Sequence, residues 1–63
     1  MTWELYEVWS VDEDGHEELV DTTKSLKEAR AMAQETLSEY FVECIIYLED
    51  DAGELQEVER ISN

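Results

Sequence analysis

Residues 41–49, FVECIIYLE, form the most apolar run of the chain and decide how the rest of it is arranged. Side chains of a β-strand alternate between two faces, and in this run both faces are apolar. A strand of that kind is typical of the centre of a sheet, where both faces are covered. One face would carry Val42, Cys44, Ile46 and Leu48, and the other Phe41, Ile45 and Tyr47.

An acidic turn and a returning strand follow this run, and the N-terminal third of the chain has the same layout. Each turn contains acidic residues and a glycine, Gly15 or Gly53, which tolerates a left-handed backbone. The sequence therefore predicts two β-hairpins that are alike in layout, without a convincing residue-by-residue repeat. The first consists of residues 2–11, the turn 12–15 and residues 16–22; the second consists of residues 41–49, the turn 50–53 and residues 54–61.

Between the hairpins, Ser25 and Glu28 have the spacing of a capping box, in which the serine caps a helix and the glutamate reaches back to the serine amide. Neither glycine nor proline interrupts residues 26–39, so we expect one helix of roughly 14 residues. Its apolar face includes Tyr40 at the far end. The predicted core combines this helix with one face of the apolar strand and consists of Leu26, Ala29, Ala33, Leu37, Val42, Cys44, Ile46 and Leu48.

These elements predict one α+β domain over residues 1–63, with the order ββαββ and one helix packed on one face of a four-stranded antiparallel sheet. The other face would then show apolar groups to water, and patches of this kind on a small domain mark an interface. We expect a homodimer through this uncovered face, with a protein partner as the second choice. The residues expected to form the interface are Tyr6, Val8, Ile45 and Tyr47.

The chain has 18 acidic and 4 basic residues among its 63, a formal net charge of −14. That is well beyond the magnitude of about 2–8 that keeps a small domain soluble, and the self-repulsion lowers its folding stability. Four basic residues are too few to neutralise a phosphate backbone, which excludes nucleic acid as a direct partner. A hydrophobic content of 43% is too high for a disordered acidic tail, so we expect the chain to fold.

The sequence also excludes several protein classes. One cysteine cannot form an internal disulfide, there is no Cys/His cluster for zinc, and no apolar run approaches 18 residues, so we expect a cytoplasmic protein without membrane contact. His16 has no nucleophile nearby in sequence, and Cys44 lies in an apolar strand where it is inert, so we expect neither enzymatic activity nor a cofactor. The acidic turns offer oxygen ligands, but Asp and Gly are ordinary turn residues, and we expect no metal site.

The acidic residues crowd into the two hairpins and onto the exposed face of the helix. Concentrated on half of the surface, they reach the charge density of a DNA backbone. We therefore expect a non-catalytic inhibitor that mimics nucleic acid and occupies the binding surface of a basic DNA- or RNA-binding protein. The acids expected to contact this partner are Asp12, Glu13, Asp14, Glu17, Glu18, Glu49, Asp50, Asp51, Glu54 and Glu57.

In size, charge and lack of catalytic motifs the chain resembles phage and mobile-element proteins that inhibit restriction, CRISPR or repair enzymes. This resemblance covers bulk properties and no motif. It implies an inhibitor of the anti-restriction or anti-CRISPR type.

Other functions fit the same composition. A domain from a halophile would carry the acid excess as an adaptation to salt and would need molar salt to fold. A dimeric adaptor would bind through the uncovered sheet face, so substitution of Tyr6 or Tyr47 would abolish its function whereas charge reversal would not. A designed sequence also stays open, although Cys44 and the lysines Lys24 and Lys27 at the helix start are choices that a designer avoids.

Overall fold

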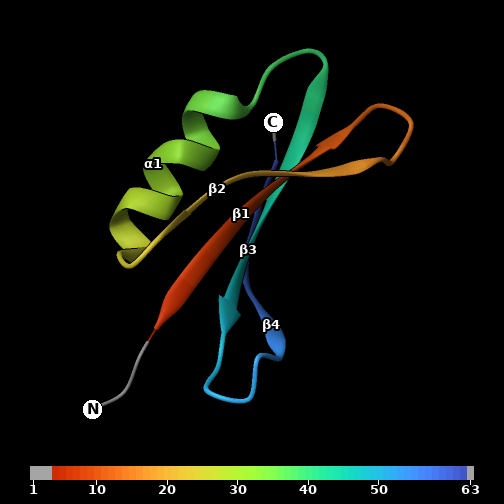
Figure 1. The fold of residues 1–63 in the computed structure, drawn as a ribbon. Helices are drawn as coiled ribbons and strands as arrows, with labels where there is room; N and C mark the ends of the chain where they lie inside the picture. The colour runs from red at the N-terminus through yellow and green to blue at the C-terminus, as the bar shows by residue number, and fades with distance from the viewer. Residues whose placement is uncertain (1–3, 63) are drawn as a thin grey trace.

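Four strands and one helix follow one another in the predicted order, so the expected ββαββ fold of the α+β class is confirmed (Figure 1). The structure is a computed structural model that describes residues 4–62, and residues 2 and 3 of the predicted first strand lie outside this range. The elements are β1 Leu5–Asp12, β2 Glu17–Thr23, α1 Leu26–Thr36, β3 Phe41–Glu49 and β4 Leu55–Ser62. The strands form one antiparallel sheet in the order β2-β1-β3-β4.

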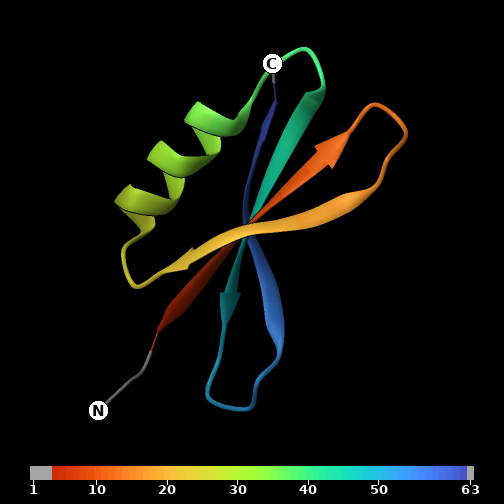
Figure 2. The same ribbon diagram turned by 45° about the horizontal axis from the view of Figure 1, so that its top comes forward.

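The helix covers one face of a strongly twisted sheet. α1 packs on β1, β2 and β3, and the two hairpins cross like the arms of an X, with their turns at different ends of the molecule (Figure 2). The domain measures 40 × 20 × 15 Å and is therefore elongated. Within residues 4–62, no helix has the length and apolar composition needed to cross a membrane.

The core lies between α1 and the two central strands. Val8 and Ile46 face each other across β1 and β3 and are fully buried. Ala29, Ala33 and Cys44 complete the buried cluster. The prediction that one face of the helix and one face of β3 form the core is confirmed at these positions, and Val8 is added to it. The side chains packed around the cluster are Tyr6, Leu26, Met32, Leu37 and Ile61.

The prediction that Val42 belongs to the core is wrong, because its side chain is 39% exposed. β3 pairs Glu43 with Val11 and Phe41 with Asp12, so Val42 is the extra residue of an irregularity in the ladder. Irregularities of this kind re-aim the side chains on either side of them. The apolar alternation of β3 is therefore interrupted near the start of the strand.

Three side chains, and not two, define the start of α1. The Ser25 hydroxyl accepts from the Glu28 amide at 3.3 Å, as the capping box predicts. The expected return bond from Glu28 to the Ser25 amide is replaced by a relay through Thr23. The Thr23 Oγ1 accepts from the Ser25 amide at 3.2 Å and donates to the Glu28 carboxylate at 2.8 Å. Because Thr23 is the last residue of β2, the relay ties the helix start to an edge strand.

The helix ends at Thr36, earlier than the predicted residue 39. Leu37 leaves the helical conformation with ψ of 134°. Ser38 then organises a local turn, because its hydroxyl oxygen accepts from the amides of Tyr40 and Phe41 at 3.3 and 3.1 Å. Tyr40, predicted to lie on the apolar helix face, is therefore 58% exposed in the connection to β3.

The two hairpins have the expected likeness in layout, and the turn and the bulge of each stand at equivalent positions. Identical residues stand 38 positions apart at Asp12 and Asp50, Gly15 and Gly53, and Val20 and Val58. These residues occupy the same structural positions, two in the turns and one in the returning strands.

Both turns are held by the same four hydrogen bonds. In each turn, the amide of the first aspartate, Asp12 or Asp50, donates to the carbonyl four residues later. The carbonyl of the same aspartate accepts from the glycine amide three residues later. The carboxylate oxygen Oδ1 of the same aspartate accepts from the amides two and four positions later, at 2.9 Å. Gly15 and Gly53 have φ of 87° and 81°, the left-handed region that glycine favours.

The bulges of the two hairpins also coincide. In β2, Val20 is an extra residue between Leu19, which pairs with Trp9, and Asp21, which pairs with Val8. In β4, Val58 is an extra residue between Glu57, which pairs with Tyr47, and Glu59, which pairs with Ile46. Since Val8 and Ile46 pair with each other, a pseudo-two-fold axis passes between them and relates each hairpin to the other. The sheet is therefore built from two copies of one supersecondary unit.

Replacing Ile46 by alanine tests this core. We expect Ile46→Ala to lower the free energy of unfolding by about 2–5 kcal/mol, because it leaves a cavity between α1 and the sheet. The matched control Val42→Ala, on the same strand, should cost less than about 1 kcal/mol. Equilibrium unfolding in urea measures both, and equal losses would contradict the assignment of the core.

Candidate protein-binding surface

The face of the sheet opposite α1, here named the open face, is defined by the strand register. Residues paired across antiparallel strands point to the same side. Its residues are Leu5, Glu7, Trp9 and Val11 of β1, Glu43, Ile45, Tyr47 and Glu49 of β3, Glu17, Leu19 and Thr22 of β2, and Leu55, Glu57, Arg60 and Ser62 of β4.

The prediction that Tyr6 and Val8 share one uncovered face with Ile45 and Tyr47 is wrong. Val8 is fully buried among residues of α1 and β3, and Tyr6 packs half-buried against the same core. The alternation within each strand was predicted, but the register between β1 and β3 decides which alternating sets coincide. The open face keeps Ile45 and Tyr47, and its β1 aromatic residue is Trp9.

The open face covers its own centre with side chains. Ile45 is only 3% exposed although it lies on the side away from α1. Trp9 stands opposite it in the ladder, and the rings of Trp9 and Tyr47 meet edge to face with centroids 6.4 Å apart. The Trp9 indole N–H donates to the Glu7 carboxylate at 3.0 Å. Trp9 and Tyr47 occupy equivalent positions in the two hairpins. Aligning the hairpins in sequence would therefore have placed Trp9 on the same face as Tyr47.

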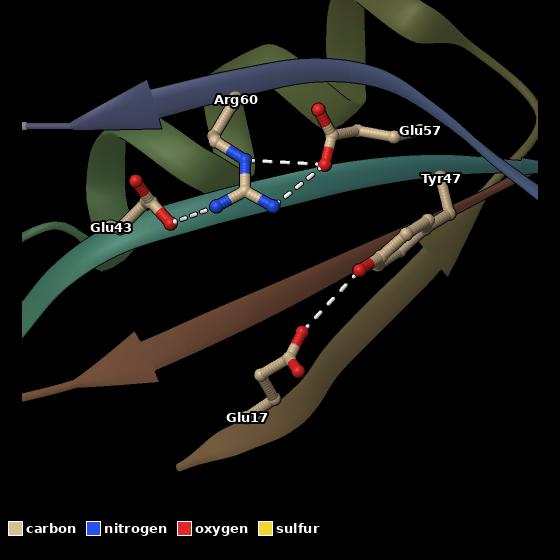
Figure 3. Close-up of polar contacts among 5 residues, drawn as sticks. All are labelled: Glu17, Glu43, Tyr47, Glu57 and Arg60. Atoms are coloured by element: carbon tan, nitrogen blue, oxygen red, sulfur yellow. Dashed lines mark hydrogen bonds and ion pairs between the residues drawn. The ribbon is translucent and has the colours of Figure 1, made fainter. Parts of the chain in front are cut away.

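Arg60 holds two carboxylates together on the open face (Figure 3). Its guanidinium donates from Nη1 to Glu43 at 2.8 Å, and from Nη2 and Nε to Glu57 at 2.7 and 3.2 Å. The hydrogen bond from Arg60 lowers the pKa of Glu57 below its ordinary value. Because these groups are exposed, solvent screens the pairs and they add little to the stability of the fold. The face thus already accommodates one guanidinium from its own chain.

A second carboxylate lies at the tip of Tyr47. The Tyr47 hydroxyl donates to the Glu17 Oε1 at 3.3 Å, reaching from β3 across β1 to β2 (Figure 3). Burial, followed by the nearby Glu17 charge, raises the pKa of Tyr47 above its ordinary value of 10.0, so the hydroxyl is neutral at physiological pH. Trp9, Tyr47, Glu17 and Leu55 line a shallow hollow of about 290 Å³ on this face.

The acids predicted to contact a partner divide into two groups. Asp12 is buried at 9% exposure and Asp50 is half-buried, and their carboxylates hold the turns. Glu49 is half-buried beside Leu5. The structure does not bring the acids of the two turns into one patch, because the turns lie at different ends of the molecule. The exposed acids of the predicted set are Glu13, Asp14, Glu17, Glu18, Asp51, Glu54 and Glu57.

The first turn brings together the ligand atoms of Asp12, Asp14 and His16, which lie within 4.8 Å of one another. The second turn has the same hydrogen bonds with Ala52 and Glu54 in the equivalent positions. The approach of these groups therefore follows from the turn geometry, and we assign no metal to it.

Cys44 is fully buried, as predicted, and its Sγ lies 3.5 Å from the Ala33 carbonyl oxygen. Burial, and to a smaller degree the charge of Glu43, raises the pKa of the thiol. The reactive thiolate is therefore disfavoured at neutral pH.

Comparison with known proteins gives no match to a family model, to a curated protein or to a solved structure.

The Asp12 carboxylate is expected to make the fold sensitive to acid. Hydrogen bonds from the turn amides, His16 first, lower its pKa below the ordinary value of 3.8. The ionised group therefore stabilises the fold above pH 3.8, and this contribution is lost as the pH falls through the lowered pKa. We expect Asp12→Asn to melt at a lower temperature than wild type at pH 7, with a difference that shrinks below pH 3.8.

The control for this variant is Glu13→Gln, which removes one charge from the same turn but no turn hydrogen bond. Thermal melts of all three proteins between pH 7 and pH 2.5 would separate the two effects. If Asp12→Asn and Glu13→Gln had the same melting temperature at every pH, the carboxylate of Asp12 would not hold the turn.

Cys44 is expected to be protected from thiol reagents in the folded protein. At pH 8 we expect labelling by a disulfide reagent to be at least about 100-fold slower than in denaturant, because the thiol is exposed only on unfolding. Fast labelling of the folded protein would show that α1 detaches readily from the sheet. The reaction is followed by the absorbance of the released thiolate.

Proposed function

We propose that this domain is a non-catalytic, cytoplasmic inhibitor that occupies the nucleic-acid-binding surface of a basic protein. The observation that carries the proposal is the density of carboxylates. The domain exposes 4365 Å² and has 18 acidic residues, or about one per 240 Å². A B-DNA cylinder carries roughly one charge per 107 Å², from its charge spacing of ~1.7 Å along the axis. Averaged over the whole surface, the carboxylate density is therefore a little under half that of the DNA backbone.

The arrangement of these acids along the long axis supports the same function. β1 runs from Leu5, which pairs with Glu49 beside the second turn, to Asp12 at the first turn. Seven residue steps of ~3.3 Å give about 23 Å along β1 between the two turns. The long axis of 40 Å is close to the ≈ 34–36 Å of one turn of B-DNA. A protein that tracks a nucleic-acid backbone over one helical turn would find negative charge over the same length.

The exposed acids at the turn tips are available for this contact. Glu13, Asp14, Asp51 and Glu54 are exposed, and the turns are held by the two aspartates that precede them. Association would be accelerated by long-range attraction and would weaken as salt rises. These properties are those of a decoy, whereas a halophilic adaptation would need no particular partner.

The test is competition between the domain and nucleic acid for one protein. The immobilised domain would be incubated with a cell extract at low salt, and each captured protein would be purified and tested for nucleic-acid binding. We expect at least one captured protein to bind labelled DNA or RNA, and the free domain to displace that nucleic acid. Binding of both ligands at the same time would contradict the proposal.

Two variants of equal charge make the test specific. Glu13→Gln with Asp51→Asn removes one exposed acid from each turn, and we expect it to weaken target binding about 2- to 30-fold. Glu35→Gln with Glu39→Gln removes two acids from α1 and the segment after it, and should have a smaller effect. All variants and the wild type should fold without molar salt by circular dichroism. A requirement for molar salt would favour the halophilic alternative.

A further inference from the structure

The hollow on the open face combines two aromatic rings with one carboxylate and one aliphatic side chain. Trp9 and Tyr47 occupy equivalent positions in the two hairpins, and so do Glu17 and Leu55. These two pairs line the hollow, which therefore lies over the pseudo-two-fold axis. The rings are alike on both sides, but one edge of the sheet contributes a charge and the other a leucine.

This asymmetry matches a side chain with an apolar stem and a cationic head. Glu17 belongs to β2 and Leu55 to β4, the two opposite edges of the sheet. A ligand lying between them would place its charge at the carboxylate and its methylene groups on the rings and the leucine. Arginine fits better than lysine, because a planar guanidinium stacks on an aromatic ring and donates in a fork to a carboxylate.

The charge of the open face favours a basic partner over a second copy of this chain. The face carries Glu7, Glu17, Glu43, Glu49 and Glu57, with Arg60 as its one basic residue. Arg60 is already engaged by Glu43 and Glu57. The partner of Glu17 is the neutral hydroxyl of Tyr47. Two such faces would repel each other, whereas a cationic segment would be attracted.

We propose that the hollow formed by Trp9, Tyr47, Glu17 and Leu55 binds an arginine side chain of the basic protein partner. The guanidinium lies against Glu17 and the aromatic rings, and the methylene stem lies against Leu55. The inference rests on the proposed function, and it places a specific contact on the sheet face in addition to the general attraction by the acidic surface.

The probes for this contact are hexa-arginine and hexa-lysine peptides, which carry equal charge. Binding would be followed by ¹⁵N NMR of the labelled domain at low salt, using backbone amides and the Trp9 indole N–H. We expect shifts centred on Trp9 and Tyr47, and an affinity for hexa-arginine about 2- to 5-fold above that for hexa-lysine.

Two neighbouring residues supply matched variants. Glu17→Gln removes the charge from the hollow but keeps an oxygen that accepts from Tyr47. Glu18→Gln removes the same charge one residue later, from an exposed side chain that pairs with Ser10 and so points to the other face. We expect Glu17→Gln to abolish the preference for arginine and Glu18→Gln to preserve it.

Other results would overturn the inference in distinguishable ways. If both peptides bind equally, and the two variants behave alike, binding is by bulk charge, so the arginine contact is wrong while the proposed function stands. Concentration-dependent shifts of Trp9 without peptide would make a second copy the occupant. If neither peptide binds at low salt, the inference and the proposed function both fail.

Discussion

The pairing of Val8 with Ile46 is the interaction on which the rest of the structure depends. It joins the two hairpins and places both residues under the small alanines of α1. A slip of one residue would exchange the faces of a whole strand. The same register sends Trp9 and Tyr47 to the open side. The core and the aromatic hollow are therefore two consequences of one strand register.

A chain with a net charge of −14 has to fold against its own electrostatic repulsion. Several of its carboxylates make contacts that stabilise the fold. Asp12 and Asp50 hold the turns, Glu28 accepts from the Thr23 relay at the helix start, and Glu59 pairs with Arg30 between β4 and α1 at 3.1 Å. The exposed acids of β2 and β4 also discourage pairing of these edges with other chains. Glu57 is held by Arg60 and Glu17 accepts from Tyr47, but acids at the turn tips such as Glu13 and Asp51 are exposed, and the repulsion that they add is what a function has to explain.

Local patterns predicted the elements, and long-range register decided what they could not predict. The acidic glycine turns, the capping serine and the apolar run at residues 41–49 each depend on neighbouring residues, and each is found as expected. The faces of β1 and β3 depend on how two segments far apart in the sequence align, and the alternation within β1 does not reveal that Tyr6 and Val8 face α1. The end of α1 depended on competition from the Ser38 hydroxyl, which helical periodicity does not reveal.

Comparison of the two hairpins distinguishes residues that the fold requires from residues that it does not require. Aspartate and glycine recur because the same turn uses them in both hairpins, and a valine stands at the bulge of each. On the covered face the hairpins must differ, since a single helix lies over a pseudo-symmetric sheet and contacts its two halves unequally. No such element covers the open face within the described residues, so packing does not demand that Glu17 stand opposite Leu55 across the axis. A ligand side chain with a charged head and an apolar stem, as proposed for the hollow, would account for this difference.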